Sequence, residues 1–233
     1  MKPLYVLCIL TMLANIAHSK ETVVLLHGLA RTSKSMQKME AKLQANGYET
    51  LNLDYPSRKH KVEYLAKEVR KQIVARTEQT TKVHFVTHSM GGILVRQIQK
   101  TAPLATIGRV VMLSPPNQGS EVIDRIGSNA AVQQVNGPAG DQLSTRNDGF
   151  IARLGPVDFE LGVITGDRSI NWINSMMIPG KDDGKVSTES AKVEGMADYR
   201  VIHATHPMIM KKQSVINETL CFIQNGTFSN SVQ

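Results

Sequence analysis

The 233-residue sequence contains only two cysteines, Cys8 and Cys221. Cys8 lies in an apolar N-terminal run that we expect to be removed, and the single remaining cysteine cannot form an intramolecular disulfide. An exported chain without disulfides has to be stabilised by its hydrophobic core, and a domain of this length is large enough to bury one.

The sequence is also poor in the features of several function classes. Its densest basic cluster, 57–61 (SRKHK), has no interleaved aromatic residues to stack on bases, which disfavours nucleic-acid binding despite the net charge of +7. A weak attraction to anionic lipid headgroups stays open. The histidines and acids show no zinc spacing such as H-E-x-x-H, so we expect no metal and no organic cofactor. Nothing in the sequence indicates an oligomeric state.

The N-terminus has the pattern of a secretory signal peptide. Lys2 precedes the apolar run 3–17, and Ala17 and Ser19 supply the small residues read by a signal peptidase, which predicts cleavage after Ser19. Removing residues 1–19 leaves 27 − 1 = 26 basic and 20 acidic residues, a charge of +6. We expect an exported protein, periplasmic or secreted. An uncleaved membrane anchor is the alternative.

Residues 20–233 alternate short apolar runs with longer amphipathic patterns. Such alternation predicts one α/β domain with a doubly wound, mostly parallel sheet covered by helices on both faces. The expected strands are 22–26, 49–53, 83–87, 109–113, 160–165 and 199–203, and the expected helices are 33–46, 61–76, 90–101 and 212–224.

One segment interrupts this alternation. Residues 114–158 are rich in Gly, Pro, Asn and Ser, and they follow the end of a predicted strand, where the ligand crevices of such sheets lie. We expect a lid-like insertion over about 121–157. The alternative is an excursion of the chain that packs on the surface without a role in binding.

Ser89, in FVTHSMGG (85–92), is the candidate nucleophile. It lies between a predicted strand and a predicted helix, which is the context of the G-x-S-x-G nucleophile elbow. Gly91 matches the second glycine of that motif, whereas Thr87 replaces the first. The departure affects the expected geometry of the turn rather than the identity of the nucleophile.

A nucleophilic serine also needs donors for the oxyanion that forms during acyl transfer. One expected donor is the backbone N–H of Met90, directly after the serine. The other is the N–H of Leu29, because Gly28 lets the chain turn after the first strand. A glycine turn without a catalytic role is the alternative.

The catalytic base and acid should follow the serine in the chain. His203 falls in a predicted strand, whereas His206 lies in the loop after it and is the favoured base. Asp167, Asp182 and Asp183 are all placed to orient that histidine, and the residues alone leave the three open.

Taken together, HGL (27–29), THSMGG (87–92), SPPNQGS (114–120), DDGKVS (182–187) and THP (205–207) resemble the bacterial secreted lipases and esterases of the α/β-hydrolase superfamily. The resemblance covers nearly the whole chain after residue 19. It implies Asp183 as the acid, His206 as the base and hydrolysis of a carboxylic ester. The expected substrate is a lipid or small-molecule ester, with lipid-like alcohols favoured. Acyl transfer or thioester cleavage by the same triad is one alternative, and a non-catalytic binding protein on the same scaffold is another.

Overall fold

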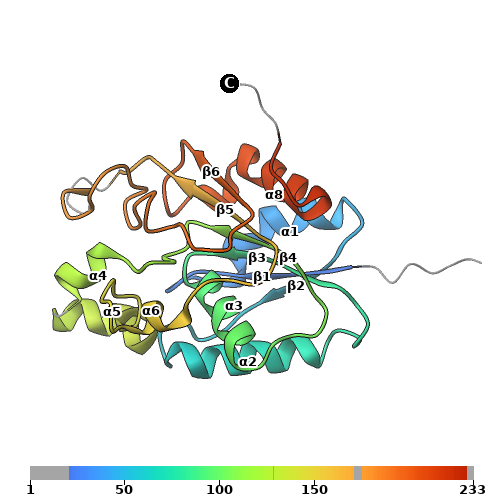
Figure 1. Ribbon diagram of the computed structural model, residues 1–233, viewed down its shortest axis with the longest axis horizontal. Helices are drawn as coiled ribbons and strands as arrows, with labels where there is room; N and C mark the ends of the chain where they lie inside the picture. The colour runs from blue at the N-terminus through green and yellow to red at the C-terminus, as the bar shows by residue number, and fades with distance from the viewer. Residues whose placement is uncertain (1–20, 128, 171–174, 230–233) are drawn as a thin grey trace, which may run out of the picture.

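The computed structural model describes residues 21–127, 129–170 and 175–229 (Figure 1). The expected signal peptide, 1–19, lies outside the described residues. Six strands form one parallel sheet in the order β2-β1-β3-β4-β5-β6. They are β1 (Thr22–Leu26), β2 (Glu49–Leu53), β3 (Val83–His88), β4 (Ile107–Leu113), β5 (Leu161–Gly166) and β6 (Asp198–Ile202).

Helices cover both faces of this sheet, which confirms the predicted doubly wound α/β fold. Figure 1 shows α1 (Gln37–Gln44) and α8 (Gln213–Asn225) on one face, and α2 (Val62–Val74) and α3 (Met90–Thr101) on the other. A hydrophobic core lies on each face of the sheet, and alternate residues of β1 contribute to each. Val24 and Leu26 pack with α2 and α3, and Val23 and Leu25 pack with α1 and α8. Side chains of successive strand residues point to opposite faces, which is why β1 is buried on both.

The topology places a ligand crevice between β1 and β3. From β1 the chain first adds β2 on one side, then crosses to β3 on the other side and continues to β6. The connections after β1 and β3 leave in opposite directions at this point, and ligands of such sheets bind in the crevice that this opens beyond the carboxyl ends of the strands. Ser89 directly follows β3, and Gly28 and Leu29 follow β1.

Some element boundaries differ from those predicted. The expected helix 33–46 consists of a 3-10 turn, η1 (Ser33–Met36), followed by α1, because the Ser35 N–H bonds the Thr32 carbonyl three residues back. β4 begins at Ile107, two residues earlier than predicted. His203 lies just beyond β6 rather than in it.

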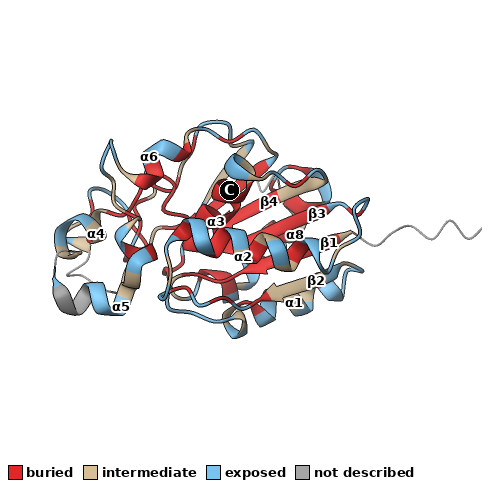
Figure 2. Cartoon of the chain, turned by 90° about the horizontal axis from the view of Figure 1, so that it is seen from below, coloured by how far each residue is buried: buried red, intermediate tan, exposed pale blue. Residues whose placement is uncertain are grey.

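The described part of the insertion 121–157 contains α4 (Glu121–Ile126), α5 (Ala130–Asp141) and α6 (Phe150–Leu154), with a kink in α5 at Gly137, where φ is 66°. Figure 2 shows α4 and α5 beyond one end of the sheet, with much of their surface exposed. Their base is held to the domain: Ser120 N–H bonds Leu143 O, and Arg96 bonds Gly155 O at 2.6 Å. The structure thus places the insertion at the carboxyl ends of the strands, and movement as a lid stays a prediction.

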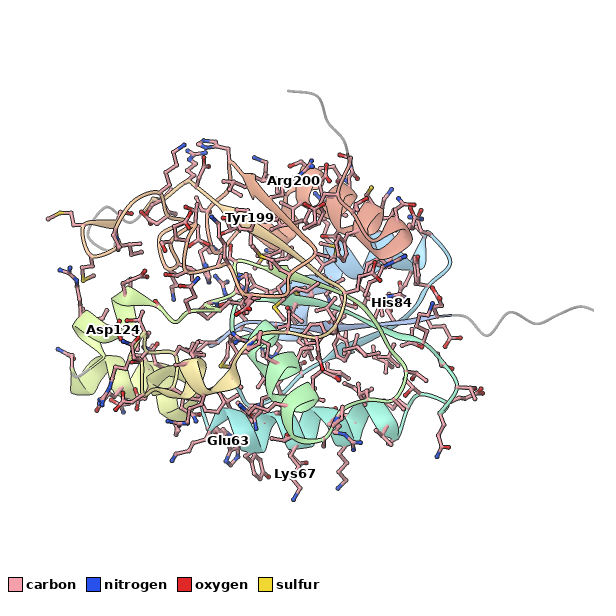
Figure 3. The ribbon with its side chains drawn as sticks, in the orientation of Figure 1. Glu63, Lys67, His84, Asp124, Tyr199 and Arg200 are labelled. Carbon is pink, nitrogen blue, oxygen red and sulfur yellow. The ribbon has the colours of Figure 1, made fainter. Side chains whose placement is uncertain are left out.

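His84 and Asp124 mark the two ends of the domain in Figure 3. His84 Nε2 lies 3.1 Å from Glu21 Oε2, close to the amino ends of the strands. Asp124 belongs to α4 at the opposite end of the domain. The fold therefore keeps this buried histidine away from Ser89. Among the described helices, none is both long and apolar enough to cross a membrane.

Candidate active site

Ser89 occupies a strained turn between β3 and α3, with φ of 52° and ψ of −123°. A positive φ is uncommon for a residue with a side chain, and such strain persists where the surrounding structure enforces it. Ala30 and Ser114 also have positive φ, at 56° and 47°, and they follow the neighbouring strands β1 and β4. Among the described residues, non-glycine positions with positive φ therefore all follow the carboxyl ends of strands, around Ser89.

Glycines make the close approach of strand and helix at this turn feasible. A Cβ at Gly91 would lie 2.7 Å from the Leu26 carbonyl oxygen, and one at Gly28 would lie 3.1 Å from the Ser89 Cβ. Gly92 explains how the buried Thr87 fits: a Cβ there would lie 3.3 Å from the Thr87 hydroxyl oxygen. Thr87 stands where the usual motif has glycine, and Gly92 of α3, which has no side chain, leaves room beside it.

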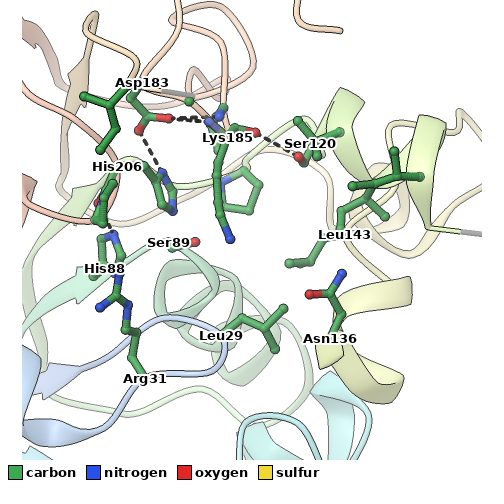
Figure 4. A pocket seen from close by; sticks show the side chains of 18 residues that line it. Leu29, Arg31, His88, Ser89, Ser120, Asn136, Leu143, Asp183, Lys185 and His206 are labelled. Carbon is green, nitrogen blue, oxygen red and sulfur yellow. Dashed lines mark hydrogen bonds and ion pairs between the residues drawn. The ribbon is translucent and has the colours of Figure 1, made fainter. Parts of the chain in front are cut away.

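Asp183 and His206 form a buried pair (Figure 4). His206 Nδ1 lies 2.8 Å from Asp183 Oδ2, and the other carboxylate oxygen accepts the Lys185 and Val186 backbone N–H groups at 3.0 Å each. The His206 backbone N–H also donates to the Asp183 carbonyl at 2.9 Å. Burial raises the pKa of Asp183, but His206 and the hydrogen bonds outweigh it, so the pKa is lowered and the carboxylate stays ionised.

The competing candidates lie in other interactions. His203 Nδ1 is 3.0 Å from Asp167 Oδ1, and its side chain is 68% exposed. Asp182 accepts hydrogen bonds from the Ser175 hydroxyl and the Gly184 N–H. Neither Asp167 nor Asp182 is paired with His206, so the geometry favours Asp183 as the orienting acid.

Ser89, Asp183 and His206 line one pocket of about 350 Å³. Its remaining walls are largely apolar and come from Leu29, the insertion and the loop that carries Asp183 (Figure 4). Within the described residues no hydrogen bond joins Ser89 Oγ to His206. Serine–histidine bonds of this kind are often long until a substrate is bound.

The backbone around Leu29 and Met90 fits the predicted oxyanion site. Among the described residues, neither N–H group is hydrogen-bonded to the protein. The turn at Leu29 is closed by the Arg31 N–H, which bonds the Gly28 carbonyl, and Leu29 itself lines the pocket. Two free donors beside Ser89 are what acyl transfer requires, and their role stays a prediction.

His88 is a site residue that the sequence reasoning did not assign. It is buried, and its Nε2–H donates to the His206 carbonyl at 3.0 Å. Burial, followed by the charge of His206, holds the pKa of His88 well below its ordinary value, so the ring is neutral. The sequence shows that His88 directly precedes Ser89. It does not show that His88 contacts His206, 118 residues further along the chain.

Arg31 and Lys185 are two further pocket residues that the sequence reasoning missed. Arg31 lies two residues after Leu29, and Lys185 lies two residues after Asp183. Both lie close to motif residues, Leu29 and Asp183, to which the sequence did assign a role. By contrast, no group of three or more His, Cys, Asp or Glu side chains in the described ranges is arranged to hold a metal ion.

The model of the alpha/beta hydrolase family matches residues 23–196, well over half of the sequence. The chain belongs to the alpha/beta hydrolase family. The matched segment of this hydrolase includes Ser89 and Asp183 and ends before His206. No curated protein sequence matches the chain.

Solved structures of other hydrolases share the fold. The mature lipase BlEst2 of Bacillus licheniformis has a TM-score of 0.66 and 20% identity, covering 91% of this chain and 94% of that one. The phospholipase PlaB of Legionella pneumophila has a TM-score of 0.62 and 18% identity, covering 74% and 44%. The metagenomic carboxyl esterase MGS0156 has a TM-score of 0.61 and 16% identity, covering 83% and 66%. At these identities the likeness shows the fold.

Proposed function

We propose that this hydrolase cleaves carboxylic esters through an acyl-enzyme formed on Ser89. The observation that carries the proposal is the buried Asp183–His206 pair, which lines the same pocket as a serine on a strained strand-to-helix turn. A binding protein gains nothing from holding a serine in an unfavourable conformation beside a carboxylate-oriented histidine.

The hydrogen bonds define the part that each group plays. Because His206 Nδ1–H donates to Asp183, Nε2 carries the lone pair and acts as the base toward Ser89 Oγ. As Oγ attacks the acyl carbonyl, the Leu29 and Met90 N–H groups stabilise the oxyanion. His206 then returns the proton to the leaving alcohol, and the same nitrogen activates the water that hydrolyses the acyl-enzyme.

The surroundings of the pocket support a lipid-like ester. Val122, Ile123 and Leu143 contribute apolar surface from the insertion. Ile170 lines the pocket and is 69% exposed, and the exposed Met208 follows the lining residue Pro207. Apolar side chains on both the wall and the rim favour an acyl chain that enters from an aggregated or membrane-bound substrate.

The proposal is tested by steady-state hydrolysis of 4-nitrophenyl esters with acyl chains of graded length, using the wild-type protein and Ser89→Ala. We expect turnover that rises with chain length and is lost in the variant. A preference for acetate would contradict the lipid-like assignment. Turnover that survives in Ser89→Ala would contradict the mechanism.

A thioester and an alcohol acceptor are included in the same assay, because the triad chemistry serves thioester cleavage and acyl transfer equally. A higher kcat/KM for the thioester than for the ester of the same chain would replace the ester assignment. Formation of a new ester in preference to free acid would identify an acyltransferase.

A further inference from the structure

Two cationic side chains flank the pocket beside Ser89, and catalysis of ester hydrolysis does not require either. Arg31 and Lys185 both line the pocket, and both side chains are exposed. Figure 4 shows the Arg31 side chain running toward His88 on one side of Ser89 and the Lys185 side chain ending on the other side. Within the described ranges, neither side chain forms an ion pair or a hydrogen bond.

Both cations are held by the turns that carry the catalytic groups. The Arg31 N–H closes the turn at Gly28, and the preceding Ala30 N–H bonds Ser57 Oγ at 3.1 Å. The Lys185 N–H bonds Asp183 Oδ1, and its carbonyl accepts the Ser120 hydroxyl at 2.9 Å. The backbone therefore fixes where each side chain enters the pocket, relative to Leu29 and Asp183.

The charges of the two side chains act on one another and on the site. Loss of hydration in the pocket, followed by the charge of Arg31, lowers the pKa of Lys185, whereas the charge of Asp183 acts to raise it. Both cations also contribute to the low pKa of His88, the neighbour of Ser89. Asp183 does not neutralise them by direct contact, because its oxygens are occupied by His206 and by backbone N–H groups.

Two like charges that line one pocket and have no ion-pair partner repel each other, and an anion bound in that pocket relieves the repulsion. A phosphate group carries a charge of about −1.5 to −2 at neutral pH, which matches the pair, and guanidinium groups bind phosphate with two parallel hydrogen bonds. The apolar walls lie on the side of the insertion, where Leu143 and Val122 meet the pocket.

We propose that the preferred substrate is an acyl ester that itself carries a phosphate group, with the acyl chain against the insertion and the phosphate between Arg31 and Lys185. This inference rests on the proposed ester hydrolysis at Ser89 and adds a substrate class to it. Arg31 and Lys185 then act as specificity-determining residues that contact the substrate without taking part in proton transfer.

The test compares 1-acylglycerol 3-phosphate with 1-acylglycerol of the same chain in the same detergent. We expect kcat/KM for the phosphate-bearing ester to be at least about tenfold higher, and this preference to fall roughly tenfold in Arg31→Gln and in Lys185→Gln, since each variant loses a charge-assisted hydrogen bond. Lys185→Arg should retain most of it. Lys67→Gln is the matched control, because Lys67 projects from α2 away from the pocket (Figure 3).

Equal kcat/KM for the two esters would overturn the inference, as would variants that slow both esters by the same factor. An ester with a carboxylate in place of the phosphate, hydrolysed faster than the phosphate ester, would overturn the choice of anion. Inorganic phosphate should inhibit far more weakly than dodecyl phosphate. Equal inhibition by the two would show a site for free anions instead.

A fluorophosphonate probe separates this inference from the proposed function. Labelling of Ser89 with no phosphate preference contradicts the inference alone. Absence of labelling in the wild-type protein contradicts the proposed ester hydrolysis as well.

Discussion

At the scale of single residues, the backbone of Ser89 is the feature most directly connected with function. Its φ of 52° and ψ of −123° lie in a region that glycine tolerates and other residues avoid. Strain of this kind costs about 1–3 kcal/mol and is commonly found where it serves an active site. The turn therefore lowers the stability of the fold while it presents the serine hydroxyl to the pocket.

Ser89→Gly should stabilise the protein while it removes activity. Glycine relieves the positive φ, so we expect the free energy of unfolding to rise by about 1 kcal/mol, measured by urea denaturation. Ser89→Ala is the control, because alanine keeps the Cβ and the strain. An equal stability change in both variants would show that the turn is not strained by its side chain.

Asp183→Asn should reduce kcat by about 10⁴-fold, since an amide no longer holds the His206 tautomer or stabilises its charged form. Asp182→Asn and Asp167→Asn are matched controls, because each changes one acid in the same part of the chain. We expect both to retain most of the activity toward a nitrophenyl ester. A larger loss in either control than in Asp183→Asn would refute the choice of acid.

At the scale of elements, the pattern of apolar residues was sufficient to predict the sheet and its main helices. Strand β1 has the predicted bounds because an apolar run of that length, buried on both faces, admits few alternatives. The split of 33–46 was not predictable, since its 3-10 turn depends on one local backbone hydrogen bond.

Site residues that belong to a recognisable sequence motif could be predicted. Residues that join the site through a long-range contact could not. Ser89, Asp183 and His206 lie in recognisable loops, and the structure brings them to one pocket. His88 was missed because its role arises from a long-range bond to the His206 carbonyl. Arg31 and Lys185 were missed because the sheet order brings their loops, about 150 positions apart in the chain, to one pocket.

The packing of α3 against β1 makes a prediction about adjacent glycines. In Gly91→Ala the new Cβ would meet the Leu26 carbonyl oxygen at 2.7 Å, and backbone cannot move aside cheaply. We expect a loss of about 1–3 kcal/mol in the free energy of unfolding, as overpacking usually causes.

Gly92→Ala provides the comparison. Its closest neighbour is the Met112 sulfur at 2.8 Å, in a flexible side chain, and alanine gains about 1 kcal/mol of helix propensity over glycine. We therefore expect a change near zero in thermal or chemical unfolding. If Gly92→Ala proves the more destabilising of the two, the Met112 side chain does not move aside for the new Cβ, which contradicts this expectation.

At the scale of the whole molecule, export is the main expectation from the sequence that remains to be tested. We predict that the mature protein begins at Lys20, because residues 1–19 have the charge and apolar pattern of a cleaved signal. Intact-mass analysis and N-terminal sequencing of protein recovered from the producing cells measure this directly. A chain that retains Met1 and stays with the membrane fraction would support the anchor alternative.

The whole molecule also combines a basic surface with a pocket that opens at one end of the sheet. The net charge of +7, or +6 without residues 1–19, favours approach to anionic lipid surfaces at low ionic strength. The positive net charge and the positive side chains of Arg31 and Lys185 should both attract a negatively charged substrate, as the proposed phosphate preference requires.

The central claim is that Ser89 is a nucleophile activated by His206 and Asp183. The most direct measurement is reaction with a fluorophosphonate probe, followed by mass spectrometry of the labelled peptide. We predict one probe adduct per chain at Ser89, much slower labelling in His206→Ala, and none in Ser89→Ala. Unlabelled wild-type protein, or equal labelling of Ser89→Ala, would contradict it.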